Sequence, residues 1–93
     1  MKRPIRERDV ERHLVRHVQQ IGGEVRKVTW PGRSGAPDRV VFFPGGVVVW
    51  VELKRPTGRA EPHQHREHER MRAMGQTVLV LRSEEDILRE FPE

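Results

Sequence analysis

Cysteine is absent from this 93-residue sequence, and its absence excludes several kinds of chemistry. Without a thiol the chain cannot form a disulfide, use a thiolate nucleophile or build a cysteine-based zinc site. Apolar residues are also scarce, at 34% of the chain, so the predicted core is small. We expect one domain that spans residues 1–93.

Long apolar runs are lacking too. The longest, Val47–Val51, is far too short to cross a bilayer, and no apolar signal region follows the charged N-terminus. We therefore expect a cytoplasmic protein with no membrane partner. Basic charge is in excess: 18 lysines and arginines stand against 14 acids, a net charge of +4. This excess favours a polyanionic partner over an acidic one.

Hydrophobic periodicity and turn residues predict an α/β fold. Val10, Leu14 and Val18 recur at helical spacing before the helix-ending pair Gly22-Gly23. A helical crossover before the last strand allows that strand to run parallel to a neighbour, so we expect a mixed four-stranded sheet flanked by helices. The predicted elements are a helix at 5–21, strands at 24–30, 38–43 and 47–53, a helix at 62–74, a strand at 77–81, and a short C-terminal helix between Ser83 and Phe91.

Two acids and a lysine carry the chemistry that this fold can bring together. Asp38 begins one strand of a predicted hairpin, and Glu52 and Lys54 lie near the end of the other. Because side chains alternate across a strand, Glu52 and Lys54 share a face, and Asp38 can lie beside Glu52. Two carboxylates and a backbone carbonyl, for which Leu53 is the candidate, can hold Mg²⁺ or Mn²⁺. The plainer alternative is an ion pair between Glu52 and Lys54 at a strand end.

The residues around these acids resemble a known family, the VRR-NUC (virus-type replication-repair nuclease) branch of the PD-(D/E)xK nucleases. The predicted order of elements is similar to the αβββαβ core of that fold. The motifs that carry the resemblance are Gly35-x-Pro37-Asp38, Glu52-x-Lys54-Arg55-Pro56-x-Gly58 and Pro62-x-Gln64.

The resemblance implies a Mg²⁺-dependent DNA endonuclease in which Mn²⁺ substitutes. Asp38 and Glu52 would then be metal ligands, Lys54 a catalytic residue, and Gln64 a helper on the second predicted helix. Within the family, the chain resembles the stand-alone viral members. This resemblance implies a homodimer in the host cytoplasm that acts on branched DNA such as Holliday junctions, alone or beside replication and repair proteins.

The family also places an acid on the first helix, and two residues compete for that position. Glu7 falls inside the apolar stripe of the helix, where a carboxylate needs a metal or a hydrogen-bond partner. Glu11 lies at the edge of the stripe, but its spacing to the following glycine, compared with junction resolvases, favours it. Either acid can instead be a solvated helix residue. The sequence leaves the choice open.

Basic and aromatic residues near the acids are candidates for DNA binding. Contacts with phosphate would anchor DNA without reading its sequence. Trp30 can stack on a base or wedge into a junction, although such a tryptophan is more often part of a core. Arg12 and Arg16 alternate with acids on a predicted helix, which is typical of a solvated face. The candidate DNA-binding residues are Trp30, Arg33, Ser34, Arg39, Arg55 and Arg59.

Two other functions stay open at this point. A non-catalytic DNA-binding module could keep the same fold, and an RNA-cleaving enzyme could use the same metal site. His63, His65 and His68 also allow a zinc site or a general base, although contact with phosphate or simple exposure is more usual for such residues. The intact set of Asp38, Glu52 and Lys54 favours the nuclease.

Overall fold

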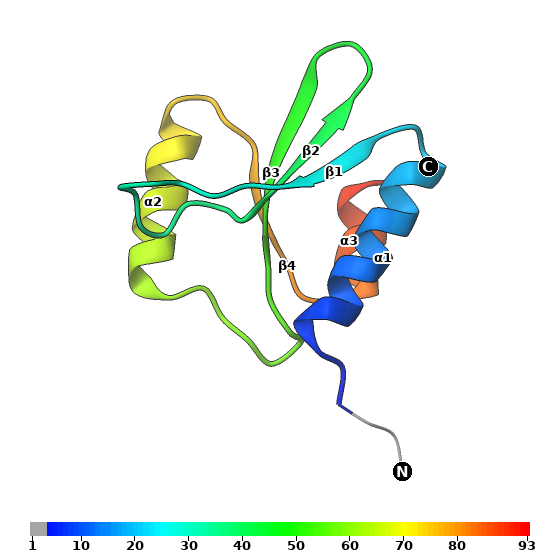
Figure 1. Cartoon of the computed structure of the whole chain (residues 1–93), viewed down its shortest axis with the longest axis horizontal. Coiled ribbons are helices and arrows are strands. Elements are labelled where there is room, and N and C mark those ends of the chain that lie inside the picture. The colour runs from blue at the N-terminus through cyan, green and yellow to red at the C-terminus, as the bar shows by residue number, and fades with distance from the viewer. Residues whose placement is uncertain (1–3) are drawn as a thin grey trace.

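The computed structural model describes residues 4–93 and has a four-stranded sheet with helices on both faces (Figure 1). All the predicted elements are found, and their ends lie within three residues of the prediction. The elements are α1 (Glu7–Gln20), β1 (Glu24–Lys27), β2 (Arg39–Phe43), β3 (Val47–Leu53), α2 (Pro62–Ala73), β4 (Val78–Leu81) and α3 (Glu84–Glu90).

The sheet is mixed, as predicted, with the strand order β1-β2-β3-β4. The first two neighbouring pairs are antiparallel, whereas β3 and β4 run parallel after the crossover through α2. Arg39 of β2 is the register partner of Val51 in β3. The register therefore brings Asp38, which precedes β2, opposite Glu52, at the end of the hairpin that is far from its turn.

The apolar core lies between the sheet and the helices α1 and α3 (Figure 1). Leu14 and Val18 of α1 are completely buried, as is Ile87 of α3, and they pack against sheet residues such as Val51 and Leu53. Full burial of one such side chain stabilises the fold by about 1.5–3 kcal/mol. Within residues 4–93, none of the helices has the length and apolar character needed to cross a membrane.

Helix α2 covers the opposite face of the sheet and buries a different kind of surface. Its buried residues are Glu67, His68 and Met71, so two of the three are polar. The His68 ring, which we expected to be exposed or to contact phosphate, is only 1% exposed and is hydrogen-bonded to the backbone of Gly35. This face of the sheet therefore holds polar and titratable groups away from solvent.

Candidate active site

Asp38 and Glu52 meet at the end of the β2–β3 hairpin, on the face covered by α2. The backbone N–H of Leu53 donates a 3.4 Å hydrogen bond to Asp38 Oδ1, which holds that carboxylate beside β3. Glu52 is 5% exposed, whereas the Asp38 side chain is 35% exposed. The site thus combines one buried carboxylate with one that faces solvent.

The buried carboxylate of Glu52 is surrounded by more negative than positive charge. Burial, followed by the charge of Asp38, raises the pKa of Glu52 to about 7, although Lys54 acts in the opposite direction. Lys54 Nζ lies 3.8 Å from Glu52 Oε2 and is the nearby cation. Asp38 Oδ2 also lies 3.4 Å from Nη1 of Arg39, whose guanidinium is shared with Glu11. The carboxylates of Asp38, Glu52 and Glu11 outnumber these two cations, and a divalent cation would add positive charge.

The donor set at this edge of the sheet fits Mg²⁺. Asp38 and Glu52 supply hard carboxylate oxygens, and the backbone of Leu53 lies between Glu52 and Lys54. Nowhere in residues 4–93 do three histidine, aspartate or glutamate side chains form a group that could hold a metal. A Mg²⁺ ion here would therefore complete its shell with water and substrate oxygens, which is its usual habit. The same finding gives no support to a zinc site at His63, His65 and His68.

Gln64 connects the start of α2 to the buried carboxylate. Its Oε1 accepts a 2.8 Å hydrogen bond from the backbone N–H of Glu61, the residue that precedes the helix. Its amide is also hydrogen-bonded to Glu52, an interaction that lowers the pKa of that group. Because the oxygen is occupied by the helix, the NH₂ group is left to face the carboxylate.

The two acids of α1 have different partners. Glu11 Oε2 accepts a 2.7 Å hydrogen bond from Arg39 Nε and contacts a second nitrogen of the same guanidinium. Glu7 is exposed at the start of α1, and its charge is one of those that raise the pKa of Glu52. The structure thus brings Glu7 within electrostatic reach of Glu52 and places Glu11 in an ion pair.

Arg39 lies in a different environment from the one that we expected of a DNA-binding residue. It is 9% exposed, and besides Glu11 it bonds the backbone carbonyl of Asp38 at 3.0 Å. Arg39 therefore ties α1 to β2 and supports the backbone of a site residue from behind. Its sequence neighbourhood gives no sign of this, because its partner lies 28 positions away.

Arg33 is also engaged within the protein. Its Nε and Nη2 donate hydrogen bonds of 2.9 and 2.8 Å to the two carboxylate oxygens of Glu67 on α2, and Arg70 binds the same carboxylate. The hydrogen bond from Arg33 is the main cause that lowers the pKa of Glu67 to about 2. Sequence reasoning missed this cluster, since Glu67 and Arg70 look like an ordinary surface pair three residues apart.

The segment between β1 and β2 packs tightly against the start of α2. Gly35 has a positive φ of 86°, and a Cβ there would lie 2.7 Å from the backbone oxygen of His63. Trp30 donates a 2.8 Å hydrogen bond from Nε1 to the carbonyl of Pro37, and its ring centroid lies 5.3 Å from that of Trp50. These contacts fix the backbone that leads into Asp38 and leave Trp30 half-buried.

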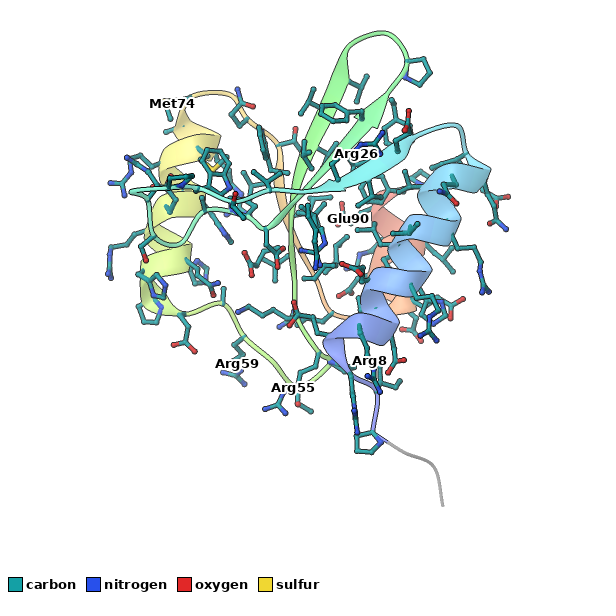
Figure 2. The ribbon with its side chains drawn as sticks, in the orientation of Figure 1. Arg8, Arg26, Arg55, Arg59, Met74 and Glu90 are labelled. Carbon is teal, nitrogen blue, oxygen red and sulfur yellow. The ribbon has the colours of Figure 1, made fainter. Side chains whose placement is uncertain are left out.

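The remaining candidates for DNA binding are exposed. Arg55 and Arg59 project from the segment between β3 and α2, away from the body of the protein (Figure 2). Ser34 is exposed beside Arg33 in the segment that packs on α2. Arg55 and Arg59 are therefore presented to solvent next to Lys54, as expected of phosphate-binding residues.

Comparison with known proteins adds two findings to this geometry. The chain is 47% identical over 83 residues, 89% of each chain, to a protein of Acyrthosiphon pisum secondary endosymbiont phage 1 named "Putative nuclease p44". A solved structure described as "VRR_NUC domain" is similar with a TM-score of 0.82 and 40% identity, over 94% of this chain and 97% of that one. No model of a protein family matches the sequence.

Proposed function

Because the chain belongs to the VRR-NUC family, we propose that it is a metal-dependent DNA endonuclease that hydrolyses phosphodiester bonds, most effectively in branched DNA such as a four-way junction. The observation that carries the proposal is the buried Glu52 beside Asp38, with Lys54 Nζ 3.8 Å from its carboxylate. A protein rarely buries a carboxylate with so little positive charge nearby unless the carboxylate binds a cation or takes part in a reaction.

Each residue of the site has a role that follows from its position. Asp38 and Glu52 would hold Mg²⁺ or Mn²⁺, with the Leu53 carbonyl as the third protein ligand. When bound, the ion would polarise the scissile phosphate and lower the pKa of a water molecule. Lys54 is placed to donate hydrogen bonds to the attacking water or to a phosphate oxygen. Gln64 keeps the Glu52 carboxylate oriented through its amide.

Three exposed positions and one half-buried ring support the part of the proposal that concerns DNA. Arg55, Arg59 and Ser34 present groups that bind phosphate oxygens around the site. Trp30 lies against Trp50 in a tilted arrangement with 5.3 Å between ring centroids, so part of its ring is covered by protein. Contact with a base would therefore involve the exposed part of Trp30 alone.

We also propose that the protein acts as a homodimer, since two symmetric sites can nick two strands of a four-way junction. Phe42, Val47 and Val48 of the β2–β3 hairpin are 45%, 49% and 37% exposed, and a second subunit could cover them. Light scattering on the purified protein tests this proposal. A monomer at micromolar concentration, with and without junction DNA, would contradict it.

The test of function is cleavage of labelled four-way junction, flap and linear duplex DNA by wild type and Asp38→Ala, in Mg²⁺, Mn²⁺ or EDTA. We expect cutting of the junction that requires metal and is lost in Asp38→Ala. RNA versions of the same junction form the second arm, and faster cutting of RNA would reassign the substrate. Tight binding of the junction without cutting in any metal would instead indicate a non-catalytic binding module.

A further inference from the structure

The arginines of this protein divide into two groups by their partners. Most of those on β1, β2, α2 and α3 are bound to carboxylates: Arg26, Arg39, Arg70, Arg72 and Arg89, together with Arg33 of the segment before β2. Arg8, Arg12 and Arg16 of α1 are different, because within residues 4–93 their side chains make no ion pair or hydrogen bond. Three exposed guanidinium groups on one helix thus remain available to an external anion.

These three arginines form one row on the outer face of α1. They are four residues apart, and Arg12 points almost opposite to the buried stripe of Val10, Leu14 and Val18. The alternation of Arg12 and Arg16 with acids predicts a solvated face, and both arginines are exposed. Two acids of the helix have partners outside the row: Glu11 binds Arg39, and the Asp9 side chain accepts the backbone N–H of Arg6 at 2.8 Å.

A groove follows this row and continues toward the candidate active site. One part has a volume of about 450 Å³, and a second part of about 390 Å³ shares Arg8 and Glu11 with it. The second part is also lined by Glu7, whose charge acts on Glu52. Figure 2 shows Arg8 at the same edge of the protein as Arg55 and Arg59. The remaining lining residues are Arg12, Val15, Arg16 and Gln19 in the first part, and Arg6, Lys27 and Arg39 in the second.

We propose that Arg8, Arg12 and Arg16 bind phosphates along one strand of a DNA duplex arm that leads away from the active site; this inference rests on the proposed nuclease function. Four residues of helix rise by about 6 Å, so the row spans about 12 Å. A DNA strand advances about 3.4 Å per nucleotide, so the row matches three or four nucleotides. Guanidinium groups without a carboxylate partner bind phosphate without first breaking an ion pair.

The measurement is binding of a fluorescent four-way junction in EDTA, where cutting is prevented, at 50 to 200 mM salt. The test variant is Arg12→Gln/Arg16→Gln. Each lost phosphate contact lowers the slope of log K against log salt by about 0.9, so the double variant should lose about 1.8 for each subunit bound to the junction, or about 3.6 for a dimer. Between 50 and 200 mM salt, the affinity of the wild type should therefore fall more than that of the variant, by about tenfold for each bound subunit.

Two matched variants separate this role from general charge. Arg26→Gln/Arg89→Gln removes the same charge from exposed arginines that already pair with Glu24 and Asp86, and it should keep the wild-type slope. Arg12→Lys/Arg16→Lys keeps the charge of the row and should also keep that slope. An equal loss of slope in the Arg26/Arg89 variant would overturn the inference, as would a wild-type slope in Arg12→Gln/Arg16→Gln.

The length of the DNA arm gives a second readout. Junctions in which two arms at a time are shortened to a few base pairs should include one pair that abolishes the difference between wild type and Arg12→Gln/Arg16→Gln, because a two-fold dimer places one row on each of two arms. If the difference persists whichever pair of arms is shortened, the row does not follow an arm. Failure of the proposed function has another signature, since the wild type itself would then not cut DNA in any metal, whatever salt dependence its binding shows in EDTA.

Discussion

Two glutamates are almost equally buried in this protein, yet their surroundings shift their pKa values in opposite directions. Glu52 is 5% exposed and Glu67 is 4% exposed. Burial and the nearby Asp38 raise the pKa of Glu52 to about 7, whereas hydrogen bonds from Arg33 and Arg70 help to lower the pKa of Glu67 to about 2. Burial by itself therefore does not identify a reactive carboxylate. The charges and hydrogen-bond donors around the carboxylate distinguish the two glutamates. Glu67 is a satisfied structural anchor, while Glu52 is left needing positive charge.

The strongest way to sharpen this contrast is Glu52→Gln. The amide keeps the shape of the side chain but removes the charge that a metal would need, so cleavage should fall by at least about a hundredfold. The melting temperature in EDTA should not fall, because the desolvated charge is gone. Cleavage assays and thermal melts check both outcomes. A variant that cuts normally would remove Glu52 from the site.

The pH dependence of stability should expose the same glutamate. Its pKa is raised from 4.5 to about 7 in the folded protein, so the folded state binds this proton more tightly than the unfolded state does. The metal-free protein should therefore lose stability as the pH rises from about 4.5 through 7, by at most about 3 kcal/mol. Urea unfolding in EDTA at pH 5 to 8 measures this loss. Glu52→Gln is the control, because its free energy of unfolding should lack this dependence on pH.

Added Mg²⁺ should reverse that loss. A ligand that binds only the folded state stabilises it by mass action, and the gain should be largest at pH 8, where Glu52 is ionised. Asp38→Ala should show a much smaller gain from the same concentration of Mg²⁺. Equal stabilisation of wild type and Asp38→Ala would place the ion elsewhere on the protein.

The segment between β1 and β2, which carries both Arg33 and Asp38, offers a smaller perturbation. Gly35→Ala forces a non-glycine residue into a φ of 86° and brings its Cβ to 2.7 Å from the His63 oxygen. The backbone strain should cost about 1–2 kcal/mol, and displacement of Asp38 should lower kcat/KM about tenfold. Gly32→Ala is the matched control, since its φ is 74° but no atom lies within 4 Å of the added Cβ. Equal effects of the two variants would exclude a role for the contact with α2.

The mildest change is expected from Glu67→Gln. It leaves Arg33 and Arg70 without their carboxylate, so the melting temperature should fall by a few degrees, while cleavage should stay within about threefold of wild type. The profile is the reverse of that expected for Glu52→Gln. Because the pKa of Glu67 is lowered to about 2, its stabilising contribution should be present above about pH 4.5 and be lost toward pH 2. A loss of cleavage as large as that of Glu52→Gln would erase the distinction.

Local patterns in the sequence predicted the fold and the meeting of Asp38 with Glu52. Alternation along β3 and a short hairpin turn are enough to fix which side chains share a face. The choice between Glu7 and Glu11 could not be made in this way, because it depends on Arg39, which reaches α1 from another element. The burial of Glu67 and His68 was missed for a related reason: they are polar residues on the buried face of α2, where a hydrophobic pattern gives no signal.

Gln64 shows how one position can answer to two requirements. For a helix start, glutamate and glutamine are interchangeable at this position, because either side chain can accept the N–H of Glu61. Next to Glu52, however, only the amide has a donor to offer, and a glutamate would add another negative charge. A designer who transplanted this helix for its stability alone could choose either residue. Glutamine at residue 64 therefore meets both requirements, whereas glutamate would meet only that of the helix start.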